Sequence, residues 1–104
     1  MDSLVSPGVI VTGGVVRRSI LSPEVHVHES AVVEDCVLMS RVEVGAGAVV
    51  RRAIIDKDVC IPSGATIGID VNADRRRFHV SHRGVVAIGK GQPVTRAADR
   101  WGVA

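Results

Sequence analysis

Aliphatic residues recur along residues 4–71 at a spacing of 17 residues, and within each repeat they step by six, six and five positions. Aligning the chain at this spacing gives three aliphatic columns. They are Leu4, Leu21, Leu38 and Ile55; Ile10, Val27, Val44 and Ile61; and Val16, Val33, Val50 and Ile67. A short repeat with one inward aliphatic per step indicates a parallel β-helix, in which stacked coils share one core.

Steps of about six residues predict three short strands per coil and a triangular prism. Two columns of smaller residues fall four places after an aliphatic, and we expect them to point inward where the prism narrows: Ala31, Ala48 and Ala65; and Ser19, Cys36, Ala53 and Asp70. Glycines fall near the expected corners, where a positive φ costs glycine little: Gly8, Gly13, Gly14, Gly45, Gly47, Gly64 and Gly68. Known coils of this hexapeptide type wind left-handed. The predicted fold is therefore all-β, a left-handed parallel β-helix of about four coils.

Two other architectures compete with this interpretation, a β-sandwich and a parallel α/β sheet. Neither predicts a constant register of 17 residues over four segments. No amphipathic pattern of helical length occurs between residues 4 and 71, which argues against helical crossovers.

The pattern changes after the fourth coil. Residues 72–78 predict a short helical turn with Asn72 as its cap. Residues 79–90 predict a returning strand or hairpin that turns at Arg83-Gly84. We therefore assign residues 1–91 to one β-helical domain and residues 92–104, with Trp101, to a flexible tail. The first coil is as apolar as the inner coils and carries no polar cap, so we expect its open rung to pack on another surface.

Composition excludes several classes of protein. Phe78 and Trp101 are the only aromatic residues apart from histidine, and the net charge is only +2, which argues against a nucleic-acid partner. No apolar run is long enough to span a bilayer, so no membrane partner is expected. Cys36 and Cys60 lie in different columns and form no disulfide framework, which is typical of the reducing cytoplasm. Cys36 occupies an inward slot and is predicted to be structural.

Charged residues also follow the repeat. The pairs Arg17-Arg18 and Arg51-Arg52 bracket Glu34-Asp35 at one-repeat intervals, which predicts an outward ladder of ion pairs. An anion-binding role for Arg52 is the less favoured alternative. The run Arg75-Arg76-Arg77 is most simply a solvated helical face, with Arg75 and Arg77 as candidate anion contacts.

Histidines could hold zinc, but the sequence offers no convergent third ligand. His26 and His28 share one strand face, and His79 and His82 lie three residues apart. No nucleophile elbow, phosphate loop or Ser-His-Asp pattern is present in the sequence. We therefore predict neither a metal site nor a catalytic residue.

Several blocks of the chain resemble the C-terminal β-helix of bacterial ADP-glucose pyrophosphorylase (glucose-1-phosphate adenylyltransferase). The resemblance covers residues 2 to about 92 and rests on the order and spacing of the blocks. These are residues 2–6, 17–22, 50–64, 73–78 and 84–91.

The resemblance implies a part in glycogen synthesis. The family enzyme converts ATP and glucose 1-phosphate to ADP-glucose and pyrophosphate, with magnesium, in an N-terminal nucleotidyltransferase domain that this sequence does not contain. The chain alone is accordingly expected to be inactive and to hold no cofactor. The family's β-helix supports homotetramer assembly, packs on the catalytic domain and helps to bind a phosphorylated sugar or related effector.

Residues that match the family's effector contacts are Lys57, preceded by Asp56, and Lys90. A lysine ammonium is a suitable point-charge contact for phosphate, and the two lysines could converge at one edge of the prism. Two alternatives remain open: a free-standing hexapeptide acyltransferase, and an oligomerisation scaffold without a ligand site.

Overall fold

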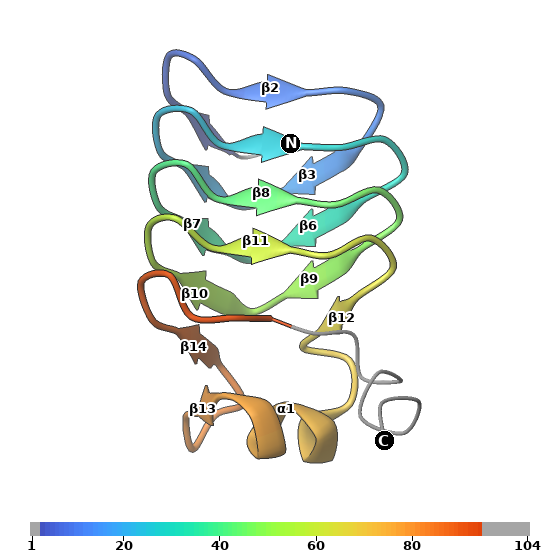
Figure 1. Cartoon of the computed structure of the whole chain (residues 1–104), viewed down its shortest axis with the longest axis vertical. Helices are drawn as coiled ribbons and strands as arrows, with labels where there is room; N and C mark the ends of the chain where they lie inside the picture. Colours follow the sequence, from blue (N-terminus) through green and yellow to red (C-terminus); the bar gives the residue numbers. More distant parts are fainter. Residues whose placement is uncertain (1–2, 95–104) are drawn as a thin grey trace.

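The structure is a computed structural model, and it describes residues 3–94. These residues form a triangular prism of stacked coils closed at one end by a short helix, as Figure 1 shows. The elements in chain order are β1 (Leu4–Val5), β2 (Ile10–Val11), β3 (Val15–Arg17), β4 (Ile20–Leu21), β5 (His26–Val27), β6 (Val32–Glu34), β7 (Val37–Leu38), β8 (Glu43–Val44), β9 (Val49–Arg51), β10 (Ala53–Ile55), β11 (Cys60–Ile61), β12 (Thr66–Ile67), α1 (Val71–Arg77), β13 (His79–Val80) and β14 (Val86–Ile88).

Each side of the prism is one sheet. Sheet A has the strand order β1-β4-β7-β10-β14-β13, sheet B the order β11-β8-β5-β2, and sheet C the order β12-β9-β6-β3. The chain crosses the front of Figure 1 from left to right along β8 and β11 and returns behind while it descends, so the coils wind left-handed. This hand is opposite to that of ordinary parallel crossovers. The predicted parallel β-helix is confirmed.

The core consists of the predicted aliphatic columns from the second coil onward, together with Val16 of the first coil. Leu21, Leu38 and Ile55 have no exposed surface and follow one another on paired strands. The predicted alanines are also buried, and Val25, Val42 and Val59 fill a further inward column that the prediction omitted. These ladders of like side chains bury apolar surface continuously along the axis, which is the main source of stability in such a fold.

The register of the first coil differs from the prediction. Leu4 pairs with Ile20 and Val5 with Leu21, while Ile10 pairs with His26 and Val11 with Val27. Val5 and Val11 therefore occupy the inward columns, and the assignment of Leu4 and Ile10 to them was wrong. The second corner of this coil is one residue shorter, because Val16 again pairs with Val33 at the 17-residue spacing.

Corners of the prism adopt left-handed backbone conformations through glycine and through other residues alike. Of the predicted corner glycines, five have positive φ: Gly8, Gly13, Gly47, Gly64 and Gly68. Seven described residues other than glycine have positive φ, and they fall at corresponding corners: Glu24, Arg41 and Asp58; Ser30; and Arg18, Asp35 and Arg52. Charged corner residues form ion pairs between rungs that glycine cannot form, such as Arg41 with Asp58 at 2.6 Å. Gly45 serves close approach instead, since an added Cβ would lie 2.6 Å from the Ser63 nitrogen.

The C-terminal end is closed by α1 and the hairpin of β13 and β14. Asp70, not Asn72, caps α1 by accepting hydrogen bonds from the Asn72 and Ala73 N–H groups. Asp70 is exposed, so its predicted inward position was wrong. The hairpin is confirmed: β13 runs antiparallel to β14, and β14 adds a fifth parallel rung beside β10.

A buried ion pair joins α1 to the last coil. Asp74 lies under α1, and its carboxylate accepts hydrogen bonds from the Gly68 N–H at 2.9 Å and from the Arg77 guanidinium at 2.9 Å. Arg77 also donates to the Thr66 carbonyl at 2.9 Å. The side chains of Asp74 and Arg77 are only 2% and 7% exposed. This pair fixes the helix as a polar plug over the apolar columns.

Part of the predicted tail is ordered against this plug. Gln92 accepts a hydrogen bond from the Gly89 N–H and donates one to the Arg77 carbonyl. Residues 95–104 of the predicted tail, with Trp101, lie outside the described residues.

Candidate functional site

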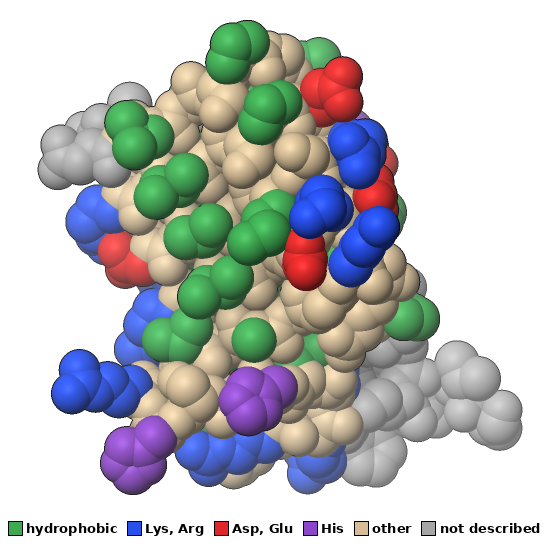
Figure 2. Space-filling view, turned by 90° about the vertical axis from the view of Figure 1, so that its left-hand side faces the viewer, with side chains coloured by type: hydrophobic (Ala, Val, Ile, Leu, Met, Phe, Trp, Pro, Cys, Tyr) green, Lys and Arg blue, Asp and Glu red, His purple; other side chains and the backbone are tan. Residues whose placement is uncertain are grey.

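The outer face of sheet A carries a ladder of apolar side chains that the fold itself does not cover. Strand pairing places five residues in one outward row: Leu4, Ile20, Val37, Ile54 and Ala87. Leu4, Ile20 and Ile54 are 70%, 45% and 44% exposed. Figure 2 shows apolar side chains gathered in a band along several coils, beside a cluster of charged groups. We call this row the apolar ladder; contiguous exposed apolar surface of this kind is typical of an interaction site.

The other two sheets differ in their outward rows. Sheet C places Val15, Val32, Val49 and Thr66 in register, a shorter and smaller apolar row. Sheet B instead presents His26, Glu43 and Cys60 in one row, with Ile10 at its end. The face of sheet A is therefore the longest apolar surface among residues 3–94.

An arginine-rich edge lies where the chain enters sheet A. Glu34 is bound by Arg17 at 3.2 Å and by Arg51 at 2.8 Å, and Arg18 binds Asp35 at 2.7 Å. The hydrogen bond from Arg18, followed by the charges of Arg18, Arg52 and Arg51, lowers the pKa of Asp35. The predicted ion-pair ladder is thus present.

Arg52 lies in the third rung of this edge and lines an open hollow of about 390 Å³ with Arg18, Glu34, Asp35 and Arg51. Its place beside two carboxylates favours ion pairing, and the hollow holds three guanidinium groups against two carboxylates.

Asp56, Lys57 and Lys90 lie together at the opposite edge, where the chain leaves sheet A. The pairing of Ile55 with Ile88 brings the two lysine-bearing corners onto adjacent rungs, and the Gly91 N–H donates to the Lys57 carbonyl. The Asp56 carboxylate accepts a hydrogen bond from the Lys57 backbone N–H at 2.7 Å and lies 3.5 Å from its Nζ.

Two carboxylates, those of Asp56 and Asp58, interact with these lysines and would compete with a bound anion. The Lys57 N–H hydrogen bond and then the charges of Lys57 and Lys90 lower the pKa of Asp56. The pKa of Asp58 is lowered mainly by its hydrogen bond from Arg41, with smaller effects of the same two lysines. Lys57 and Lys90 therefore converge as the sequence predicted, at an edge shared with two carboxylates.

The two candidate anion contacts on α1 differ in accessibility. Arg75 is exposed, whereas the guanidinium of Arg77 is committed to Asp74 and Thr66 and stacks at 4.8 Å over the Phe78 ring. This placement argues against Arg77 as an anion contact and assigns it a structural part.

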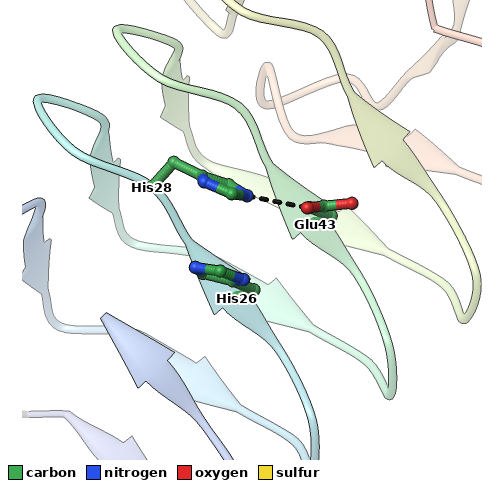
Figure 3. Close-up of side chains that lie close together, drawn as sticks. All are labelled: His26, His28 and Glu43. Carbon is green, nitrogen blue, oxygen red and sulfur yellow. Dashed lines mark hydrogen bonds and ion pairs between the residues drawn. The ribbon is translucent and has the colours of Figure 1, made fainter. Parts of the chain in front are cut away.

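Sequence reasoning missed the environment of the histidines on sheet B. The rings of His26 and His28 stack with centroids 3.8 Å apart, and His28 Nε2 lies 2.7 Å from Glu43 Oε2. Figure 3 shows the His28 imidazole pointing toward Glu43 on the neighbouring rung, with the His26 ring beside it. The 17-residue register could have predicted the position of Glu43, because Glu43 follows His26 by one repeat.

The two cysteines have different environments. Cys36 is buried, and desolvation raises its pKa to about 11, which agrees with the predicted structural part. Cys60 is exposed on the row of His26 and Glu43, and both thiols are free.

Among residues 3–94, no helix is both long and apolar enough to cross a membrane.

Comparison with known proteins decides the family. The family model described as "GlmU-like, C-terminal hexapeptide" matches residues 1–88. The chain belongs to this hexapeptide family.

The curated relatives named below are similar over most of this chain but only over their own C-terminal part. Glucose-1-phosphate adenylyltransferase of Parafrankia sp. is 54% identical over 91 residues, which are 86% of this chain and 22% of the relative. The enzymes of that name from Anaeromyxobacter sp. and Corynebacterium jeikeium are 47% and 53% identical over 93 and 89 residues. The hexapeptide chain spans between a fifth and a quarter of these relatives' length.

Proposed function

We propose that this chain is the docking and regulatory β-helix of a glucose-1-phosphate adenylyltransferase. The observation that carries the proposal is the 54% identity over 86% of the chain to the C-terminal part of such an enzyme. In this function the chain contributes no catalytic residue. It packs on a nucleotidyltransferase domain that transfers an adenylyl group from ATP to glucose 1-phosphate, and magnesium belongs to that domain.

The apolar ladder is the surface on which the catalytic domain docks. It runs over five rungs of a rigid sheet, and ionic edges flank it on both sides. An apolar centre with a charged rim is the usual anatomy of a specific protein interface. The relatives' remaining length supplies a partner of the required kind.

The edge of Asp56, Lys57 and Lys90 is the part of the effector site that this chain contributes. Two ammonium groups on adjacent rungs can both approach one phosphorylated metabolite. Because Asp56 and Asp58 partly neutralise them, tight binding needs further cations from the docked domain. The effector then binds at the rim of the interface and links docking to regulation.

The valine row of sheet C is suited to a second copy of the chain and supports the homotetramer implied by the family. The alternative of an acyltransferase is less suitable, because no loop interrupts the coils between Leu4 and Ile67.

A grafted enzyme tests the effector site. The C-terminal part of the Parafrankia relative is replaced by this chain, and the rate of ADP-glucose formation is measured against the concentration of added phosphorylated sugars. Replacing both Lys57 and Lys90 by Ala removes two charge-assisted contacts, so the half-activating concentration should rise about tenfold or more with the saturated rate unchanged.

Arg83→Ala is the control, because Arg83 is an exposed cation on the hairpin turn, away from this edge. It should leave the activation curve in place. An unshifted curve in the double variant, or an equal shift in the control, would remove the two lysines from the effector site.

A further inference from the structure

The row of His26, Glu43 and Cys60 on sheet B lies on a different side of the prism from the proposed docking face, and the proposed function does not use it. Among residues 3–94, the group of possible metal ligands consists of His26, His28 and Glu43, whose ligand atoms all lie within 4.8 Å of one another. This cluster therefore needs a separate explanation.

His26 provides the first reason to look for a ligand. Its Nε2 atom is buried and has no hydrogen-bond partner, alone among the buried side-chain nitrogens and oxygens of the described residues. Buried polar atoms are nearly always paired, so an orphaned imidazole nitrogen indicates a missing partner. His28 covers it through ring stacking at 3.8 Å and cannot supply one in this arrangement.

Charge and donor type decide what that partner is. Two imidazole nitrogens and one carboxylate oxygen form a donor set that zinc and similar divalent transition ions prefer. At metal–ligand distances near 2.0–2.1 Å, tetrahedral ligands lie roughly 3.3 Å apart. The ligand atoms lie within 4.8 Å of one another, and binding requires the stacked imidazole rings to rotate apart so that both nitrogens face the ion. The 2.7 Å contact between His28 and Glu43 already brings two of the ligands together.

The backbone holds the three residues on rigid rungs. His26 pairs with Glu43 in the ladder of β5 and β8, and the His28 N–H donates to the Val44 carbonyl at 3.0 Å. A shallow groove of about 300 Å³, lined by His28, Glu43 and Cys60 among others, gives access from solvent. Ligands fixed in this way lose little freedom on binding an ion.

We propose that His26, His28 and Glu43 bind one divalent transition-metal ion of the zinc class. Three protein ligands leave a fourth position for water. The ion gives the His26 nitrogen its partner and replaces the His28–Glu43 hydrogen bond by two coordinate bonds. It also ties β5 to β8 from outside, so the bound form of the chain is the more stable one.

Zinc affinity of the 104-residue chain is measured by competition with a chromophoric chelator, without any added enzyme. We expect one ion per chain. His26→Ala, His28→Ala and Glu43→Gln should each weaken binding about 100-fold or more, since even an indirect supporting contact is worth 10–100-fold. His79→Ala and Cys60→Ser are matched controls, an exposed histidine on β13 and the neighbouring thiol, and both should bind as the unaltered chain does.

Thermal unfolding gives an independent reading. Saturating zinc should raise the midpoint of the unaltered chain but not that of His28→Ala or Glu43→Gln, and circular dichroism confirms that the variants are folded. The proposal is overturned if the unaltered chain binds no ion. It is equally overturned if the three ligand variants bind as tightly as the chain they derive from, or if His79→Ala or Cys60→Ser loses the site.

Discussion

Asp74→Ala should lower the free energy of unfolding of this chain by about 3–5 kcal/mol, measured by urea unfolding with circular dichroism. The substitution leaves the Arg77 guanidinium, 7% exposed, without its carboxylate partner. It also removes the acceptor of the Gly68 N–H. The loss of stability is large because the charge of Arg77 stays buried at the end of the apolar columns.

Two further variants separate the ion pair from helix capping. Asp70→Ala removes only the exposed cap of α1 and should cost about 1 kcal/mol. Adding Arg77→Met to Asp74→Ala should recover much of the lost stability, because an apolar side chain replaces the unpaired charge. If Asp74→Ala cost no more than Asp70→Ala, the buried pair would not be what fixes the plug.

Ile54→Asp should prevent the chain from associating with a nucleotidyltransferase domain. Ile54 lies in the apolar ladder and is 44% exposed in the free chain. An aspartate there is solvated before docking but must lose that solvation without a partner in an apolar contact, at a cost of several kcal/mol. We expect affinity for the separately prepared N-terminal part of the Parafrankia relative to fall at least about 100-fold, as measured by calorimetry.

Ile10→Asp is the control for this experiment. Ile10 is 51% exposed and points outward at the end of the polar row of sheet B. The two variants introduce the same charge at similar exposure, so both should stay as stable as the parent within about 0.5 kcal/mol. Equal affinities of Ile54→Asp and Ile10→Asp would show that the apolar ladder is not the docking face.

The core of the β-helix could be predicted from sequence because the rule that governs it is local and repeated. Inward residues recur at fixed positions in every step, and a shift of one position would expose a column. The same rule failed in the first coil, where apolar residues occur at both alternating positions, as in Leu4-Val5 and Ile10-Val11. There only strand pairing decides which side chain faces the interior.

The backbone conformation of the corners was harder to predict than the inward columns. Left-handed backbone was expected of glycine, yet Arg18, Asp35 and Arg52 adopt it in three successive coils. Sheet ladders on both sides fix the chain and impose this conformation, which isolated residues would avoid. The charges of these residues predicted the ion pairs correctly, because ionic ladders depend on the 17-residue register alone.

The candidate sites show the same difference between features set by the repeat and features set by the folding of distant segments. Lys57 and Lys90 lie 33 positions apart and converge only because β14 returns to sheet A, which the predicted hairpin anticipated. Arg77 is buried because α1 packs on the last coil. The sequence alone did not distinguish it from the exposed arginines beside it. Glu43 is a neighbour of His26 in the register of the repeat and not in sequence, so proximity along the chain gives no sign of it.

Regulation restored by addition of this chain is the most direct test of the central claim. The Parafrankia relative is prepared without its C-terminal part, and ADP-glucose formation is followed with activating phosphorylated sugar as the 104-residue chain is added. We predict that the chain binds the shortened enzyme and returns a response to the phosphorylated sugar, and that the relative's own C-terminal part, added as the reference, does the same. If the relative's own segment restored the response and this chain neither bound nor restored it, the assignment as a docking and regulatory β-helix would be wrong.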